Sequence, residues 1–253
     1  MTSEQEFLQD YDPHQYAPVA TTVDTVIFTI RQGILSVLLI ERGEHPYQGA
    51  WAIPGGFINP TEDADEAAVR ELYEETGINA ELENMHLEQL KTYTAPNRDP
   101  RMRVISIAYV ALVSDMPSPT YGDDAAGARW WAVDDILNPQ EEADRIELAF
   151  DHEQILRDGL ARARAKIEYA PVATSFLEEE FTIADLRRVY ETVWGESLHP
   201  PNFRRKVLST PGFVEPIGSK GMSVTGGRTA ALYKRGTGTL LHPAILQSET
   251  KAE

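Results

Sequence analysis

The sequence contains no cysteine among its 253 residues. This absence excludes disulfide bonds and zinc sites built on thiolates. Its apolar runs are far shorter than the roughly 20 residues that a membrane-spanning helix requires. The first twenty residues are acidic and lack an apolar core, so they do not have the pattern of a secretory signal peptide. We therefore expect a cytoplasmic protein that has no membrane partner.

Positive charge is scarce in most of the chain, because residues 1–180 carry 13 Lys and Arg against 34 Asp and Glu. Residues 181–235 reverse this balance with nine Lys and Arg against four Asp and Glu, although the whole chain has a net charge of −17. Such an asymmetry indicates two modules with different partners. The basic module is a candidate for binding nucleic acid.

An acidic segment in the first module, residues 56–78, reads GFINPTEDADEAAVRELYEETGI. Residues 63–76 within it are good helix formers without Gly or Pro. Glu71, Glu74 and Glu75 stand at positions i, i+3 and i+4, so their carboxylates share one helical face and repel one another. Mg²⁺ would remove this repulsion, because it takes several oxygen ligands and bridges to substrate phosphates. The alternative is a solvated acidic face, which is the usual meaning of a charge run.

Other residues of this segment also suit a metal site. Gly55 and Gly56 let backbone carbonyls approach an ion. Arg70 is placed to neutralise and orient a neighbouring carboxylate, for which Glu62 is the candidate. Gly77 is predicted to end the helix in a left-handed conformation.

The spacing from Gly56 through Glu62 to the run REL-x-EE-x-GI at residues 70–78 resembles an intact Nudix box. The resemblance implies an α/β fold, a Nudix α/β/α sandwich around a mixed sheet. It also implies binding or hydrolysis of a nucleoside diphosphate linked to another group, with Mg²⁺ as the cofactor and Mn²⁺ as an alternative. The metal ligands and catalytic groups that it implies are Glu71 and Glu75 first, then Glu74, the supporting Gly55 carbonyl and Arg70 as a positioning group.

The rest of the first module alternates short apolar segments with turns. Its β-branched and aromatic runs predict strands at residues 21–30, 34–41, 86–92, 103–112 and 129–133. Apolar residues near helical spacing predict a helix at 150–167. Strands interleaved with helices favour a mixed α/β layer.

The substrate-binding candidates are Trp51, Gly56, Phe57, Arg98 and Arg101. The two arginines lie in the loop NRDPR at residues 97–101 and are suited to bidentate hydrogen bonds with phosphate or ribose oxygens. A similar RDPR loop is found in ADP-ribose-type Nudix domains, and this narrows the resemblance to that group. The aromatic pair is suited to stacking on adenine. The alternatives are a solvated turn for the arginines and core packing for the aromatic residues.

Asp123 and Asp124 lie in the loop before the last predicted strand of this module. A loop carboxylate serves as general base in hydrolysing relatives of this family. The alternative is an acidic pair on the surface, which is the commoner role of such a pair.

The second module begins where Pro171 interrupts the helical pattern. It contains two predicted helices, 183–194 and 202–209, followed by two short predicted strands, 213–217 and 229–234. Helix, helix and β-ribbon in about fifty residues resembles a winged helix-turn-helix. We predict a first domain at 1–170, a small winged helix-turn-helix domain at 171–235 and a flexible tail at 236–253.

In a helix-turn-helix the second helix enters the major groove of DNA, and its N-terminal residues face the base edges. The DNA-binding candidates are Asn202, Arg204, Arg205 and Lys206 in that helix, with Lys220 and Arg228 in the wing. The alternative is a basic docking surface for another protein or for the acidic domain of the same chain.

The whole arrangement resembles the family of Nudix-related transcriptional regulators, the NrtR type, from Tyr11 to Arg235. The resemblance implies a homodimeric repressor of NAD-metabolism genes that binds ADP-ribose and a double-stranded DNA operator. Many such regulators have a degraded box, whereas the box here is complete, so hydrolysis of the bound nucleotide is also expected. The alternative function is a plain Mg²⁺-dependent ADP-ribose pyrophosphatase whose second module serves dimerisation or docking.

Overall fold

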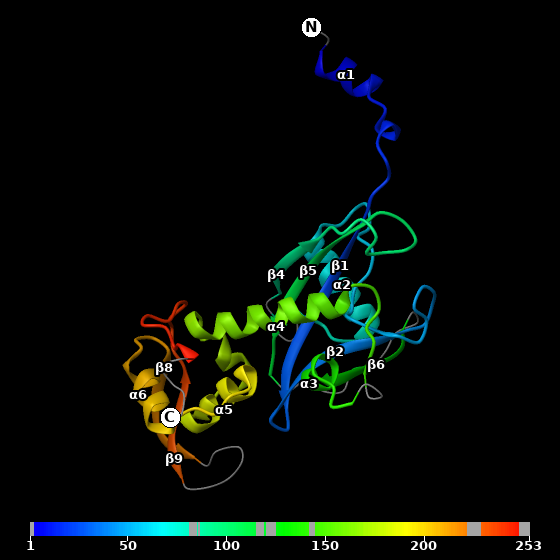
Figure 1. Cartoon of the computed structure of the whole chain (residues 1–253). Coiled ribbons are helices and arrows are strands. Elements are labelled where there is room, and N and C mark those ends of the chain that lie inside the picture. Colours follow the sequence, from blue (N-terminus) through cyan, green and yellow to red (C-terminus); the bar gives the residue numbers. More distant parts are fainter. Residues whose placement is uncertain are drawn as a thin grey trace.

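The computed structural model describes residues 3–80, 85, 87–114, 119, 125–141, 145–221 and 229–247. The N-terminal α/β module contains α1 (Glu4–Asp10), β1 (Ala20–Arg31), β2 (Ile34–Arg42), β3 (Trp51–Ala52), α2 (Ala64–Thr76), β4 (Glu88–Tyr93), β5 (Val104–Leu112), β6 (Ala125–Ala132), α3 (Val133–Leu137) and α4 (His152–Tyr169). The C-terminal module contains β7 (Phe181–Thr182), α5 (Ile183–Trp194), α6 (Pro200–Ser209), β8 (Val214–Gly221) and β9 (Ala230–Arg235). Figure 1 shows that the C-terminal module lies at the far end of α4 from the sheet.

A six-stranded mixed sheet forms the centre of the N-terminal module. Its strand order is β3-β2-β1-β5-β4, and β6 pairs antiparallel with residues 36–42 of β2. Strand β1 runs parallel to β5 and antiparallel to β2. Residues 22–29 of β1 are all buried, as expected for a β-branched and aromatic run that is covered on both faces.

Helices cover both faces of this sheet. Successive residues of a strand point to opposite faces. Val23 and Ile27 of β1 belong to the clusters on the α2 side, where Leu72 is fully buried. Val26 and Phe28 belong to the cluster that contains α4. The predicted α/β/α sandwich is therefore confirmed.

The acidic segment folds into α2 with bounds within one residue of those predicted. Asp63 caps the helix and accepts a hydrogen bond from the backbone of Glu66, while the Glu66 side chain accepts one from the Asp63 backbone. This reciprocal capping box satisfies amides that the first turn leaves unpaired. Gly77 ends the helix at φ 70°, which confirms the predicted left-handed end.

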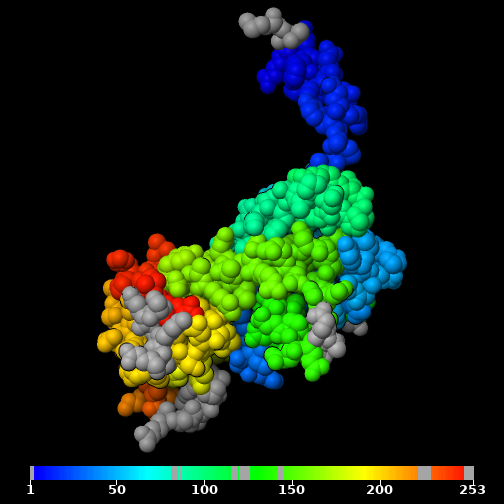
Figure 2. Space-filling model, viewed as in Figure 1, coloured from blue at the N-terminus to red at the C-terminus, as the bar shows by residue number. Residues whose placement is uncertain are grey.

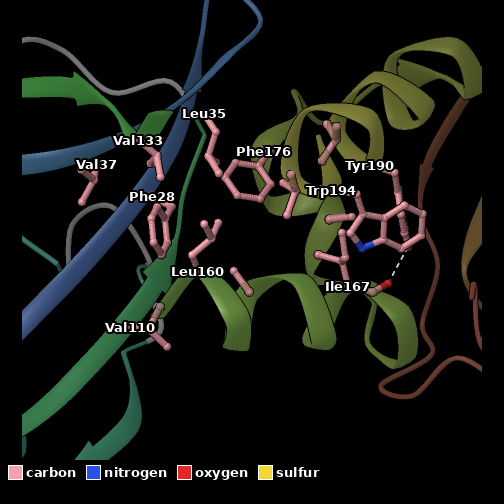
Figure 3. Packing of buried hydrophobic residues seen from close by; sticks show 14 of the residues in the cluster. Phe28, Leu35, Val37, Val110, Val133, Leu160, Ile167, Phe176, Tyr190 and Trp194 are labelled. Carbon is pink, nitrogen blue, oxygen red and sulfur yellow. Dashed lines mark hydrogen bonds between the residues drawn. The ribbon is translucent and has the colours of Figure 1, made fainter. Parts of the chain in front are cut away.

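Helix α4 belongs to both modules. Its Ile167 carbonyl accepts a hydrogen bond of 2.7 Å from the Tyr190 hydroxyl of α5, and its Arg164 carbonyl accepts one of 3.2 Å from Trp194 Nε1. One buried cluster continues from Phe28 in the sheet to Tyr190 in α5 (Figure 3). Figure 2 shows the C-terminal module packed directly against α4. The two modules therefore share a core.

The C-terminal module has the predicted helix, helix and β-ribbon. Thr182 caps α5 through a reciprocal pair with Asp185, and Gly195 ends the helix at φ 73°. Helix α6 begins at Pro200, where a proline costs no intrahelical hydrogen bond. Strand β7 is too short to have been predicted, and it completes a three-stranded sheet in the order β7-β9-β8. The winged-helix expectation is confirmed.

The prediction of a flexible tail after residue 235 is wrong for residues 236–247. Leu241 is 4% exposed and Ile245 is fully buried. Their amides donate hydrogen bonds to the carbonyls of Tyr169 and Glu168 at the end of α4. The segment is held by a few apolar side chains without helical or strand periodicity, which is why the sequence pattern did not reveal it.

The N-terminal segment before the sheet contains a short helix. Ser3 and Glu6 form a capping box that starts α1. Figures 1 and 2 show this arm extending away from the body. Within the described residues, no helix combines the length and apolar character needed to cross a bilayer. Residue 86 of the predicted strand 86–92 lies outside the described residues.

Candidate functional site

A cavity of about 420 Å³ opens beside α2, which is in the size range of small-molecule sites. Its walls come from the end of β2, the Gly55–Phe57 turn, α2, the 98–101 loop and the residues just before α4. The predicted residues that line it are Gly55, Gly56, Phe57, Arg70, Glu71, Glu74, Glu75, Arg98 and Arg101. The fold therefore brings the acidic helix and the arginine loop to the same space.

Arg70 is the centre of an ion-pair cluster on α2. Its Nε lies 2.9 Å from Glu62 Oε2, and its Nη1 lies 2.8 Å from Glu71 Oε1 and 2.9 Å from Glu74 Oε2. Hydrogen bonds from Arg70 and from the Asn59 amide hold the pKa of Glu62 at about 2. The expected pairing of Arg70 with Glu62 is confirmed, and one guanidinium offsets part of the repulsion between three carboxylates.

Glu75 is the least compensated carboxylate of the helix. Its Oε2 accepts one hydrogen bond of 2.8 Å from the Gly55 amide. Burial raises the pKa of Glu75 to about 8, and the nearby carboxylates of Glu71 and Asp24 act in the same direction. Burial also raises the pKa of Glu71, which the Arg70 contact opposes. A divalent cation would stabilise the charged form of a buried carboxylate that has a raised pKa and acidic neighbours.

The residues fit a divalent cation in their chemistry, although they are not in a ready ligand arrangement. Among the described residues, no group of three or more His, Cys, Asp or Glu converges as metal ligands, because the α2 carboxylates are turned onto Arg70 and the Gly55 amide. Gly56 is required beside them, since a Cβ there would lie 2.3 Å from Glu71 Oε1. Carboxylate and carbonyl oxygens are the donors that Mg²⁺ prefers. The donor set therefore suits Mg²⁺ or Mn²⁺ once these side chains turn to the ion.

Asp24 is a cavity residue that the sequence analysis did not single out. It lies in the middle of β1, is 5% exposed, and accepts a short hydrogen bond from the Ser106 hydroxyl. Its carboxylate lies 3.5 Å from Arg98 Nη2 and 3.5 Å from His152 Nε2. A charged residue inside a β-branched strand was the signal that could have revealed it, because a charge at such a position is rare unless it is paired.

Arg98 is placed in the cavity wall, but it is bound to the protein itself. Its side chain is 4% exposed, and its Nε and Nη2 lie 3.0 and 2.6 Å from the two carboxylate oxygens of Asp151. Arg101 is 41% exposed and pairs with Asp99 at 2.8 Å. Of the two predicted arginines, Arg101 is therefore the one with its guanidinium open to a ligand.

Aromatic rings and arginines alternate along the mouth of the cavity. Arg101 lies over the Phe57 ring at 5.2 Å and over the Phe150 ring at 5.9 Å. Arg42 also lies over the Phe150 ring, at 4.9 Å from its centroid. Phe150 and Arg42 were missed by the sequence analysis because neither belongs to a recognisable motif. Flat rings beside guanidinium groups suit a base and its phosphates.

Trp51 does not line the cavity within the described residues. Its ring packs edge-on against Trp131 at 5.1 Å, and Arg129 lies over it at 5.6 Å. Core packing, the alternative considered for this residue, agrees with this position. Asp123 and Asp124, the candidates for a general base, lie outside the described residues.

The basic candidates of the second module gather on α6. Phe203 and Val207 are fully buried beneath this helix, so the residues between them face outward. Arg204 and Arg205 are exposed and make no ion pair with any residue that the structure describes. The other candidates are Asn202 and Lys206, both half-buried on α6, Lys220, exposed on β8, and Arg228, which lies outside the described residues.

Comparison with known proteins agrees with both modules. A model of the NUDIX domain matches residues 20–152, and a model of the NrtR DNA-binding winged helix domain matches residues 173–234. The ADPR responsive transcriptional repressor NtrR of Acinetobacter baylyi is 32% identical over 235 residues, which cover 92% of this chain and 88% of that protein. The chain belongs to the NrtR family of Nudix proteins. We refer below to residues 20–152 as the Nudix domain and to residues 173–234 as the winged-helix domain.

Two further relatives are similar to this NrtR-family chain. The crystal structure of Shewanella oneidensis NrtR with a 27mer DNA has a TM-score of 0.68 and 31% identity, with 85% of this chain and 93% of that chain covered. The ADP-ribose pyrophosphatase of Methanocaldococcus jannaschii is 38% identical over 122 residues, which cover 48% of this chain and 64% of that enzyme. The Nudix domain thus has similarity to a regulator and to an enzyme.

Proposed function

We propose that this protein is a transcriptional repressor of NAD-metabolism genes whose Nudix domain binds ADP-ribose or a related nucleoside diphosphate derivative. The observation that carries the proposal is that one chain combines a nucleotide-sized cavity with an exposed basic helix. A nucleotide-sized cavity lies at one end of α4, and exposed Arg204 and Arg205 lie on the second helix of a winged helix packed on the other end. The protein acts on DNA in the cytoplasm.

The cavity chemistry supports a nucleoside diphosphate as the ligand. Arg101 and Arg42 bring positive charge to the mouth, and Phe57 and Phe150 offer ring faces beside it. An aromatic face suits an adenine base, and a guanidinium suits a diphosphate or a ribose. The relatives with 32% and 38% identity carry ADP-ribose in their names, which agrees with this choice.

Mg²⁺ is the proposed cofactor, with Mn²⁺ as an alternative. Glu71, Glu75 and Glu74 would hold it together with the Gly55 carbonyl, and Arg70, which contacts Glu71 and Glu74, would keep these carboxylates in position. When bound, the ion polarises a phosphorus–oxygen bond and lowers the pKa of a coordinated water. The protein supplies the buried Glu75 carboxylate, whose raised pKa means that a bound cation would stabilise its negative charge.

DNA recognition follows from α6. Arg204 and Arg205 reach guanine edges or phosphates, Asn202 suits an adenine, and Lys206 and Lys220 suit the phosphate backbone. Arg228 is proposed as a further wing contact. A homodimer places two such helices on a palindromic operator, with half-sites one or two helical turns apart.

The test uses the full chain and a labelled duplex from the region upstream of its own gene. Regulation predicts binding whose affinity falls steeply as salt is raised, because each neutralised phosphate releases counterions. ADP-ribose is then added, and the DNA affinity must change. Absence of DNA binding at low salt overturns the repressor assignment.

A plain ADP-ribose pyrophosphatase is the second candidate, and the complete acidic segment of α2 favours retained hydrolysis in either case. Incubation with ADP-ribose and Mg²⁺ is expected to release AMP and ribose 5-phosphate. Turnover without any DNA binding supports the enzyme alone. DNA binding without turnover of several nucleoside diphosphate sugars leaves a sensor.

A further inference from the structure

The segment that leads into α4 (residues 150–152) also borders the cavity. Phe150 and His152 line the cavity, and Asp151 lies between them. Phe150 adopts φ 55°, a left-handed conformation that is unusual for an aromatic residue. Such a conformation persists only where the surrounding contacts hold it. The entry to α4 is therefore fixed by its neighbours and not by its own backbone preference.

Three separate parts of the cavity hold this entry. Arg98 of the 98–101 loop makes the bidentate pair with Asp151, with N···O distances of 3.0 and 2.6 Å. The Ile53 amide donates a hydrogen bond of 2.9 Å to His152 Nδ1. Asp24 of β1 lies 3.5 Å from both Arg98 and His152. The start of α4 is thus in contact with three separate parts of the cavity wall.

The Arg98–Asp151 pair is a strong contact in an unusual place. Asp151 is the N-cap residue of α4, but its side chain makes no capping hydrogen bond and is directed to Arg98. Arg98 also lines the cavity in which the proposed nucleotide would bind, although its side chain is only 4% exposed. A diphosphate beside Arg98 offers the guanidinium a second anionic partner, and this competes with Asp151.

The other end of α4 is joined to the winged-helix domain. Besides the contacts of Tyr190 and Trp194, Arg164 Nε donates a hydrogen bond of 2.9 Å to the Val193 carbonyl of α5. Figure 3 shows Ile167 of α4 beside Tyr190 and Trp194. Helix α4 has 18 residues without a proline, so a displacement of its first turn moves its last turns as well.

We propose that the Phe150–His152 segment, held by Arg98, is the joint through which ligand in the Nudix cavity changes the position of the winged-helix domain. This inference rests on the proposed function, because it requires both a nucleotide and a DNA ligand. The coupling arises because the ligand binds two arrangements of the joint with different affinity. Phosphate near Arg98 favours the arrangement in which the Arg98–Asp151 pair is weakened.

The test compares Asp151→Asn with Glu153→Gln, a matched control in the same turn of α4. Glu153 pairs with Arg157 at 2.8 Å on the exposed side of the helix and does not line the cavity. Asparagine keeps the shape of Asp151 and remains a good N-cap, but it removes the charge that Arg98 holds. Each full-length protein is titrated with the labelled duplex, with and without α,β-methylene ADP-ribose and Mg²⁺, a ligand that cannot be hydrolysed.

The expected result is a change in DNA affinity of at least about 5-fold on adding the analogue to the wild type and to Glu153→Gln. Asp151→Asn should still bind the analogue and the duplex, but the change should fall below about 2-fold. If the analogue changes the DNA affinity of Asp151→Asn as much as that of the wild type, the proposed joint is wrong. A wild type that binds no analogue in calorimetry overturns the proposed function instead, so the two failures are distinguishable.

A second measurement needs no variant, and it decides the matter if Asp151→Asn does not fold. Hydrogen exchange of the wild type is followed with and without the analogue. The joint predicts altered exchange in peptides covering residues 150–158 and also in peptides covering 186–195 of α5. Altered exchange in the Nudix domain alone, with no change in α5, contradicts the proposal.

Discussion

Charged side chains in the Nudix cavity are bound to one another, whereas the arginines of α6 face solvent. Arg70 touches three carboxylates and Arg98 is 4% exposed in its pair with Asp151. Arg204 and Arg205 are exposed and form no ion pair within the described residues. The charged groups of the cavity are therefore held by partners inside the protein before a ligand or ion arrives, while the α6 cations depend on an external polyanion.

The difference corresponds to two kinds of partner. A small ligand and an ion require fixed groups, because every misplaced contact is a large part of a small interface. DNA offers a long row of phosphates, and exposed cations on a well-packed helix are enough to bind it. Below α6 the support is apolar, with Phe203 fully buried and in ring contact with Tyr190 at 5.2 Å.

The largest effect is expected at Glu75. Glu75→Gln removes the proposed metal charge, and we expect hydrolysis of ADP-ribose to fall by about 10³-fold, since even outer-shell changes at metal sites cost about 10–100-fold. AMP release at saturating Mg²⁺ measures it. Glu74→Gln is the comparison, because Glu74 is 55% exposed and should matter less. Equal losses in both variants would contradict the view that burial distinguishes the two carboxylates.

The next effect tests the apolar support of the winged-helix domain. Ile245 is fully buried and its amide is bound to Glu168 of α4, so Ile245→Ala should lower the free energy of unfolding by about 3 kcal/mol. Urea unfolding measures this change. Leu240→Ala is the control, because Leu240 is 68% exposed and should shift stability by less than about 0.5 kcal/mol. Equal stability of Ile245→Ala and wild type would mean that the tail is not docked in solution.

The contrast between the regions also explains what the sequence could reveal. The spacing of the α2 glutamates and the cap at Asp63 predicted a helix and its site, because both depend on local periodicity. Asp24 was not predicted, since its role arises from contacts with residues far away in the sequence, such as Arg98. Phe150 was not predicted, since its position depends on a left-handed φ. The docked Ile245 was missed for the same reason, because burial of one side chain in a distant groove leaves no pattern.

A smaller effect is expected on α6. Arg204→Ala with Arg205→Ala should weaken DNA binding by about 10- to 100-fold and lower the slope of log K against log salt by up to about 2. Fluorescence anisotropy from low to high salt measures both. Arg157→Ala serves as the control, because Arg157 is a half-exposed arginine already paired with Glu153 on α4. An unchanged salt slope in the double variant would assign DNA binding to another surface.

The smallest expected effect is on the pH dependence of the free energy of unfolding, to which the buried Glu75 of the cavity contributes. Burial holds the pKa of Glu75 at about 8 against an ordinary value of 4.5, so the folded protein keeps a proton between these pH values that the unfolded chain releases. The contribution of this group is therefore present below pH 4.5 and is lost as pH rises to about 8. In EDTA, Glu75→Gln should match wild type at pH 4 and exceed its free energy of unfolding at pH 8.5 by on the order of 1 kcal/mol or more, since one pKa unit corresponds to about 1.4 kcal/mol. Both proteins share His152, so the difference between their urea curves isolates Glu75.

Mg²⁺ should remove or reverse the advantage of the variant, because the ion replaces the proton on the wild-type carboxylate alone. A variant with the same pH dependence as wild type would show that Glu75 is charged and solvated, and that the cavity holds its charges no more tightly than α6 does.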